Sequence, residues 1–342
     1  MTNLYARFQA WRIRIKYVLL QKGFRLFLSI TSSRWWNPKE YPDTLIPPPK
    51  GTSDLYSSRV FRPSKPSSDK NKQLPLIIQV HGGAFIINTP SADDALARFL
   101  ADNVGAVVVN IDYRKAPQQI FPKGYEDVVA SALALLDDHS GLGIDKQRIA
   151  MTGRSAGGNL VLAAAQDPRL RGRVRVVQAL YPVCDAGVPF ADKMASRPNA
   201  KVKDVLEEGY EDILGLYLGP GFQKKRVEDD VRISPGRFTE RRDLPEFVHL
   251  VGAEHDLLCG DAESMALRLA VGVQKQETAW GWEAGNVKYD MVKGETHGFD
   301  VFATRGKEFE EARLRHKEEM YGGMAEWFKR VFDVDQTAYE LE

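Results

Sequence analysis

The pentapeptide G-R-S-A-G at residues 153–157 could supply a nucleophile. An apolar segment at 148–152 precedes it and a segment of helical composition at 156–166 follows, so the pattern is G-x-S-x-G in a strand–turn–helix context. Glycines at both ends of such a turn allow close backbone approach, and the serine, Ser155, is then held in a strained conformation that exposes its hydroxyl. The pattern is short, and a Gly-rich turn without chemistry would also produce it. A nucleophilic serine also needs a base, an acid and donors to the oxyanion.

The base and the acid are expected after the serine, in the order acid then histidine. His297 follows the last predicted strand, where a side chain can lie over the carboxyl edge of a parallel sheet. His249 lies in an apolar strand and His316 in a charged helical segment, so both are interpreted as structural. The strand before His297 ends near Glu254 and Asp256, and we prefer Asp256 as the residue that orients the imidazole.

Residues 79–85, Q-V-H-G-G-A-F, end another apolar strand and could contribute to an oxyanion hole. Small residues at such a turn leave backbone amides free to point at developing negative charge. The amide that follows the serine, that of Ala156, would be a further donor. Taken singly, H-G-G is equally well explained by an ordinary turn after a strand, but upstream of the serine pentapeptide the combination is far more specific.

These residues are far apart in sequence, so a fold must bring them together. Alternating apolar and helical segments predict an α/β protein with a mainly parallel sheet. Strands are expected at 56–61, 76–80, 106–111, 148–152, 174–180, 247–251 and 287–291, and helices at 125–136, 156–166 and 308–331. A polar, Pro-containing segment interrupts this order, and its helical patch at 205–218 favours a lid. The expected domains are an N-terminal amphipathic helical segment at 1–45 that is part of the lid, a core at 46–185 and 241–335, and a lid insertion at 186–240.

Composition excludes several classes of protein. The chain has 342 residues, 43% of them hydrophobic and 27% charged, which argues against disorder, collagen and coiled coil. A net charge of +1 does not suggest nucleic acid as the main partner. The two cysteines, Cys184 and Cys259, lie far apart, which excludes a disulfide framework or a cysteine-built zinc site and is typical of a reducing compartment. We expect a cytoplasmic location, with a peripheral-membrane or organellar location through the basic N-terminus as the alternative.

The N-terminus is basic and amphipathic. Residues 1–39 contain eight Lys or Arg and no acid. Helical spacing places a set of apolar side chains on one face: Leu4, Phe8, Trp11, Ile15, Val18 and Leu19. Three interpretations stay open: a helix packed over the domain, a basic helix resting on a membrane surface, and an Arg-rich organellar presequence. No apolar run is long enough for a membrane span or a secretory signal.

Taken together, the motifs resemble the hormone-sensitive-lipase-like branch of the α/β-hydrolases, which includes carboxylesterases and arylacetamide deacetylase-like proteins. The segments that carry the resemblance are H-G-G-A at 81–84, D-Y-R-K-A-P at 112–117 with Phe121-Pro122 and Asp127, G-R-S-A-G-G-N at 153–159, Asp256, and H-G-F at 297–299. The resemblance covers about residues 74–330 and implies an α/β-hydrolase fold, a helical lid and esterase chemistry without a cofactor or metal. It implies that Ser155 is the nucleophile, His297 the base and Asp256 the acid. The oxyanion donors would be Gly83, Ala84 and Ala156, with Gly82 holding the turn.

The sequence also departs from the family pattern. Ala84 stands where a third glycine is usual; its methyl group is tolerable if φ is negative but narrows the oxyanion hole. Arg154 stands where an acid usually precedes the nucleophile, and it could bind an acidic substrate group. Phe85 is a further expected substrate contact. Residues 273–285 are expected to form an extra loop beside His297.

The predicted function is that of a serine carboxylesterase-type hydrolase that forms an acyl-enzyme on a small to medium hydrophobic ester. An acyltransferase, a lactonase or an amide or formamide hydrolase in natural-product tailoring is the alternative with the same triad. A third class is a non-catalytic ligand-binding relative, and the presence of His297 counts against it. The expected partners are the small-molecule ester and, through the N-terminal helix, a membrane surface; a homodimer could form, and nucleic acid is not expected.

Overall fold

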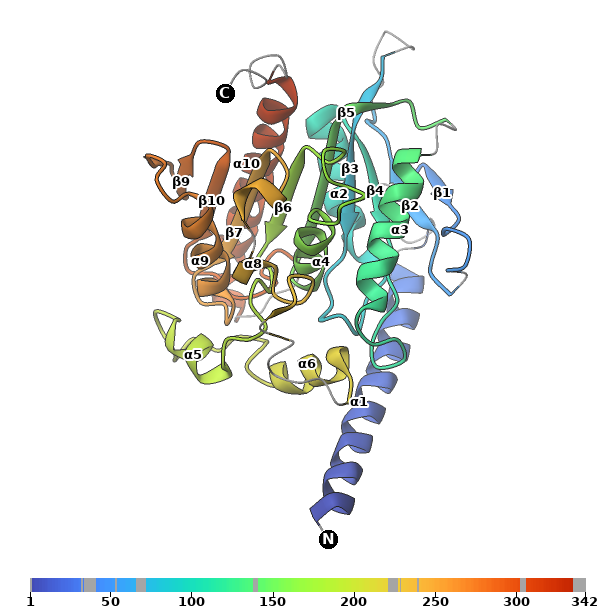
Figure 1. Ribbon diagram of the computed structural model, residues 1–342, viewed down its shortest axis with the longest axis vertical. Coiled ribbons are helices and arrows are strands. Elements are labelled where there is room, and N and C mark those ends of the chain that lie inside the picture. Colours follow the sequence, from blue (N-terminus) through green and yellow to red (C-terminus); the bar gives the residue numbers. More distant parts are fainter. Residues whose placement is uncertain are drawn as a thin grey trace.

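A ten-stranded sheet forms the centre of the molecule (Figure 1). The computed structural model describes residues 2–31, 33, 41–52, 54–65, 72–137, 141–220, 227, 229–238, 240–301 and 306–334. The strands are β1 (Thr44–Ile46), β2 (Ser58–Phe61), β3 (Leu74–Val80), β4 (Val107–Ile111), β5 (Ile144–Arg154), β6 (Val176–Leu180), β7 (Phe247–Ala253), β8 (Gln276–Glu277), β9 (Gly281–Ala284) and β10 (Val287–Val292). Their order across the sheet is β1-β2-β4-β3-β5-β6-β7-β10-β9-β8.

The central strands, from β4 to β10 in this order, run parallel, and antiparallel strands extend the sheet at both edges. Every residue of β4 and β6 is buried, because helices cover both faces of the sheet. This explains the short runs rich in valine and isoleucine, which are typical of strands that have no face in contact with water.

The helices lie in two layers (Figure 1). One face of the sheet carries α3 (Lys123–Asp137), α4 (Ala156–Ala164) and α9 (Cys259–Leu269), and the other carries α2 (Asp94–Leu100) and α10 (Glu310–Asp333). Alternate residues of a strand divide between the layers: Ile78 belongs to the first buried cluster and Ile77 to the second. The predicted α/β-hydrolase fold class, with a mainly parallel sheet and helices on both faces, is confirmed.

The edge beyond β10 differs from the prediction. Residues 273–285 contain β8 and β9, which form antiparallel strands on β10, and Trp282 of β9 is buried against Tyr289 with 5.8 Å between ring centroids. The expected extra loop beside His297 is therefore wrong, because the tryptophan is used to extend the sheet. Helices α2 and α9, and two short helices of the 186–240 segment, were not predicted from the sequence.

Two helices of the insertion and the N-terminal helix lie at the end of the sheet to which the parallel strands point (Figure 1). The segment 186–240 contains α5 (Phe190–Ala195), α6 (Tyr210–Leu218) and α8 (Pro235–Phe238), so the expected helical patch is present and begins at Tyr210. The N-terminal helix α1 (Thr2–Thr31) lies beside α6 and projects beyond the body of the molecule. The division into core and lid stays a prediction. Within the described residues no helix is both long enough and apolar enough to cross a membrane.

Candidate active site

Ser155 lies at the turn between β5 and α4 in the strained conformation expected of an exposed nucleophile, with φ 54° and ψ −121°. The turn depends on its two flanking glycines. A Cβ on Gly153 would come within 2.5 Å of the Gly157 carbonyl oxygen, and one on Gly157 would overlap the carbonyl oxygen of Val80. Both glycines are therefore required by close backbone approach, as predicted.

Three residues from three separate turns meet above the sheet. His297 Nε2 lies 2.8 Å from Ser155 Oγ, and His297 Nδ1 lies 2.8 Å from Asp256 Oδ2. Asp256 follows β7 and His297 follows β10, and these strands are parallel neighbours, so their carboxyl ends place both residues at one edge. The structure thus brings together the predicted nucleophile, base and acid. Glu254, the other candidate acid, instead accepts a hydrogen bond from the Gly294 amide at 2.8 Å.

The imidazole of His297 is buried among carboxylates. Burial alone would lower its pKa, but the charge of Asp256, then its hydrogen bond and the charges of Asp204 and Asp300, outweigh burial, and the pKa is raised above 6.5. Asp256 is fully buried, and its second oxygen accepts the Leu258 amide at 2.8 Å, so the acid is held rigidly.

Asp204 belongs to this site and was missed by sequence analysis. Its Oδ2 accepts a hydrogen bond from the backbone amide of His297 at 2.8 Å. Burial, and then the charge of Asp256, raise the pKa of Asp204. The residue lies in the polar segment V-K-D-V of the 186–240 insertion, where no motif distinguishes it from a solvated acid.

The H-G-G turn forms a second wall of the site. Gly83, Ala84 and Phe85 have φ values of 125°, 55° and 60°, so three consecutive residues have left-handed backbone conformations. The methyl of Ala84 would be tolerable if φ were negative, but φ is positive, so Ala84 is held in strain of roughly 1–2 kcal/mol. Gly83 cannot be replaced in the same way, since a Cβ would overlap the carbonyl oxygen of Ile87.

The predicted oxyanion donors remain available in this arrangement. Among the described residues, the backbone amides of Gly83, Ala84 and Ala156 donate no recorded hydrogen bond to another protein group. The amide of Ala156 opens α4, and the first amides of a helix have no partner within the helix. Gly82 packs closely on the nucleophile turn, since a Cβ there would lie 3.0 Å from the carbonyl oxygen of Arg154.

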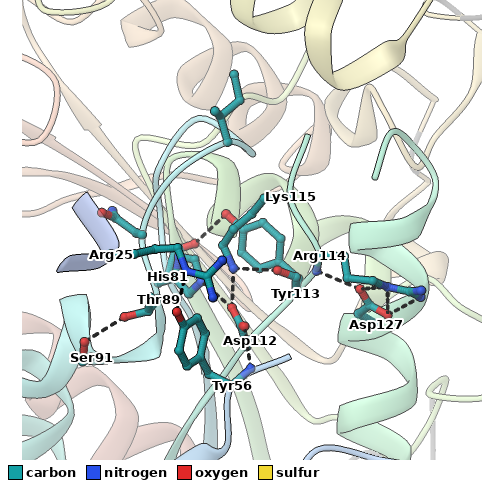
Figure 2. A network of polar contacts seen from close by, with 12 residues as sticks. Arg25, Tyr56, His81, Thr89, Ser91, Asp112, Tyr113, Arg114, Lys115 and Asp127 are labelled. Carbon is teal, nitrogen blue, oxygen red and sulfur yellow. Dashed lines mark hydrogen bonds and ion pairs between the residues drawn. The ribbon is translucent and has the colours of Figure 1, made fainter. Parts of the chain in front are cut away.

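A polar network supports this turn from behind (Figure 2). His81 places Nδ1 2.7 Å from the Gly82 carbonyl oxygen and Nε2 3.2 Å from Asp112 Oδ1, and its ring stacks on Tyr113 at 4.6 Å. The ammonium group of Lys115 contacts the same carboxylate. Burial would raise the pKa of Asp112, but Lys115 and His81 lower it on balance. The D-Y-R-K segment thus fixes the position of the oxyanion turn.

Arg154 does not reach the substrate side of the nucleophile. Its guanidinium is buried and forms ion pairs with Asp93 at 2.9 Å and Asp300 at 2.8 Å. Asp300 also accepts hydrogen bonds from the hydroxyls of Tyr321, at 2.8 Å, and Tyr181. The expectation that Arg154 binds an acidic substrate group is therefore wrong, because both of its charged neighbours are internal carboxylates.

A small apolar cavity of about 20 Å³ lies over Ser155. Its lining comes from the oxyanion turn, the start of α4, residue 183 and the insertion: Ala84, Phe85, Ser155, Ala156, Val183, Leu206, Tyr210, Ile213 and Leu214. Phe85 thus lines the cavity, as expected of a substrate contact, and it stacks on Tyr217 of α6 with 3.8 Å between ring centroids. The insertion therefore shapes the space above the nucleophile.

Fold and site together define a serine hydrolase-type centre on a parallel sheet. A family profile described as an alpha/beta hydrolase fold matches residues 77–301, more than half of the chain. The chain belongs to this α/β-hydrolase family and to its hormone-sensitive-lipase-like branch.

The chain is similar in sequence to proteins that are named as esterases. An arylesterase from Saccharolobus solfataricus is 31% identical over 221 residues, which is 62% of this chain and 65% of that protein. The carboxylesterase NlhH of Mycobacterium tuberculosis is 32% identical over 206 residues, 58% of this chain and 62% of that protein. The matched region thus spans less than two thirds of the length of these relatives. A solved esterase from the archaeon Pyrobaculum calidifontis has a TM-score of 0.69 and 26% identity, with 92% of this chain and 93% of that chain covered.

Proposed function

We propose that this protein is a serine carboxylesterase that works through an acyl-enzyme. The observation that carries the proposal is the continuous hydrogen-bonded series Ser155–His297–Asp256, with 2.8 Å at each step, beneath an apolar cavity. The esterase names of the relatives support the same reaction class.

The chemistry follows from the geometry. Ser155 Oγ attacks the ester carbonyl while His297 Nε2 accepts the serine proton, and Asp256 holds the imidazole and stabilises its charged form. The amides of Gly83, Ala84 and Ala156 donate to the oxyanion of the tetrahedral intermediate. The imidazolium then protonates the departing alkoxide. Water, deprotonated by His297, releases the acid from the serine by the reverse sequence.

The cavity suggests a short acyl group. A cavity needs ~10–15 Å³ to hold a single water molecule, so the volume of about 20 Å³ leaves room for a group only slightly larger. An acetyl methyl group fits that space, whereas a long chain would have to extend beyond it. We therefore propose an acetyl or similarly short acyl ester, at the small end of the predicted range.

Turnover of p-nitrophenyl acetate, butyrate, octanoate and dodecanoate tests the proposal. We expect the highest kcat/KM with acetate and a steep fall toward dodecanoate. A fluorophosphonate probe should label the wild-type protein and leave Ser155→Ala unlabelled. Folded wild-type protein that neither hydrolyses any of these esters nor reacts with the probe would contradict an esterase.

Acyl transfer, or action on a lactone or amide, is the second candidate for the same triad. Three departures from the family pattern motivate this candidate. Ala84 lines the cavity, whereas Arg154 and the segment 273–285 do not. Incubation of a short-chain ester with excess alcohol or amine distinguishes the two reactions, since a transferase forms the new ester or amide and a hydrolase forms the free acid.

For the location we retain the proposal of a reducing compartment. Cys184 and Cys259 are both free and buried. Burial raises the pKa of the Cys184 thiol well above its ordinary value, which keeps it protonated and unreactive. Thiols of this kind need no oxidising environment for the fold to form.

A further inference from the structure

From residue 11 onward, where its side chains are described, the helix α1 contacts the body of the protein along one face. Tyr17 and Gln21 are its buried residues in the part whose side chains are described. The amide nitrogen of Gln21 donates to the carbonyl oxygens of Ile86, at 2.6 Å, and Ala116, at 2.8 Å. These bonds attach the helix to the loop that continues from the oxyanion turn and to the segment that follows β4.

The opposite face of α1 is apolar and exposed. Ile15, Leu19, Leu26 and Ile30 have exposed fractions of 37%, 62%, 65% and 51%. With a rotation of about 100° per residue they fall within an arc of roughly 60°, on the side away from Tyr17 and Gln21. We call these four residues the outer stripe. Eight of the eighteen exposed large hydrophobic side chains among the described residues lie on this one helix, so they are not scattered singly as surface apolar residues usually are.

The same helix is strongly basic. Residues 2–31 contain six cations and no acid: Arg7, Arg12, Arg14, Lys16, Lys22 and Arg25. The chain's net charge of +1 therefore divides into +6 on this helix and −5 on the rest of the protein. Lys16 and Lys22 are exposed and lie on either side of the outer stripe. An apolar stripe between long cationic side chains is the pattern of a helix that lies in a lipid interface.

A second copy of the chain fits this surface less well. Stripe-to-stripe pairing would bring the cations on that side of the helix, Arg12, Lys16 and Lys22, close to those of the second copy. Anionic headgroups instead complement the charge, and the hydrocarbon boundary receives the apolar side chains. The helix also projects beyond the body of the molecule, so a flat surface can reach it (Figure 1).

We propose that α1 binds an anionic membrane surface, with the outer stripe at the boundary between headgroups and acyl chains and its lysines on the lipid phosphates. The helix lies along the interface and does not cross it. Gln21 joins α1 to the loop that continues from the oxyanion turn, and Arg25 of the same helix lies in the network of Figure 2. The membrane-bound helix therefore holds the catalytic domain in a defined orientation.

Vesicle flotation with the full chain tests the proposal. We expect recovery with vesicles of phosphatidylcholine plus phosphatidylserine, weak recovery with phosphatidylcholine alone, and loss of binding as salt rises. Leu19→Ser/Leu26→Ser should weaken binding by about tenfold or more, and Lys16→Gln/Lys22→Gln by several-fold. Val271→Ser/Val273→Ser is the matched control, since it removes two exposed apolar residues elsewhere and should bind like wild type.

Thermal melting of each variant checks that it is folded, because the substituted side chains are exposed and their loss should leave Tm nearly unchanged. The proposal is overturned if wild type does not bind the anionic vesicles, or if the stripe variant binds as well as the Val271/Val273 control. Light scattering tests whether a second copy of the chain covers the outer stripe instead. A wild-type dimer that the stripe variant converts to a monomer would assign the stripe to that second copy.

Discussion

The charges around the imidazole ring of His297 determine at which pH this proposed base can accept a proton. His297 must be neutral to accept the serine proton, yet Asp256, Asp204 and Asp300 all favour its charged form. Together they outweigh burial, so His297 holds a proton to higher pH than a free histidine does. The same carboxylates stabilise the imidazolium that forms when Ser155 attacks the ester, and this favours the reaction.

The pH dependence of kcat/KM should reflect this balance. Because the pKa of His297 is raised above 6.5, activity should increase with pH through an apparent pKa above that value and level off at alkaline pH. The pH profile with p-nitrophenyl acetate, corrected for spontaneous hydrolysis, measures it. An acid limb centred below 6.5 would contradict the assigned electrostatics.

Asp204→Asn separates charge from hydrogen bonding. The amide oxygen can still accept the His297 backbone hydrogen bond, while one of the negative charges that raise the imidazole pKa is removed. We expect the acid limb of kcat/KM to move to lower pH, with a modest loss of the maximum rate. Asp204→Ala should lose more activity, since it also leaves a buried amide unpaired. An unmoved acid limb in Asp204→Asn would show that this carboxylate is only structural.

Substitution of Arg154 tests the contribution of its buried ion pairs to stability. Arg154→Met leaves Asp93 and Asp300 as unpaired buried charges, so the free energy of unfolding should fall by about 3–5 kcal/mol. Urea denaturation measures this loss. Arg154→Lys should retain part of the stability, and its KM ratio for acidic against neutral esters should equal that of wild type. A selective rise in KM for acidic esters would restore Arg154 as a substrate contact.

At the scale of elements, α6 determines the space above the nucleophile. Its residues Tyr210, Ile213 and Leu214 line the cavity over Ser155, and Tyr217 of the same helix stacks on Phe85 of the oxyanion turn. A helix from the insertion and a turn from the core thus close one small apolar space. Acyl-chain selectivity should therefore follow the side chains of α6, while the reaction chemistry follows the turns after β3, β5, β7 and β10.

Ile213→Ala/Leu214→Ala should enlarge the cavity by removing six side-chain carbons. We expect the ratio of kcat/KM for octanoate over acetate to rise by about tenfold or more, since each methylene accommodated in an apolar pocket is worth roughly 1–3 kcal/mol. Leu216→Ala is the control on the same helix, since Leu216 is half-buried and does not line the cavity. An equal change in the control would indicate general loosening of the helix.

At the scale of the whole molecule, segments far apart in sequence support one site. The N-terminal helix holds the loop behind the oxyanion turn through Gln21, the core supplies the triad, and the insertion supplies Asp204 and the cavity wall. Through Gln21, α1 is thus joined to the framework of the site, whichever surface the helix binds.

Removal of residues 1–31 should therefore reduce turnover of soluble p-nitrophenyl acetate. The carbonyl groups of Ile86 and Ala116 lose their side-chain donor, and we expect kcat to fall by about tenfold. Removal of residues 1–10 alone keeps Gln21 and serves as the control. Equal activity of the two truncated proteins, both with cooperative melting, would show that the oxyanion turn does not need the helix.

The sequence by itself determined the features that depend on local backbone geometry and on chain order. Gly153 and Gly157 are required by a turn of fixed shape, so the pentapeptide indicated a candidate nucleophile, and the H-G-G turn and His297 made the prediction specific. Apolar runs that precede His81, Asp256 and His297 placed these residues after the carboxyl ends of parallel strands, and strand order then brought the predicted base and acid to Ser155.

Only the tertiary structure decided which charges face one another. Whether Arg154 meets substrate or internal carboxylates depends on Asp93 and Asp300, which come from distant segments. The place of Asp204 beside His297 and the positive φ of Ala84 are likewise set by packing between elements. Coulombic and hydrogen-bonding energies depend on distances across space, and a sequence records only distances along the chain.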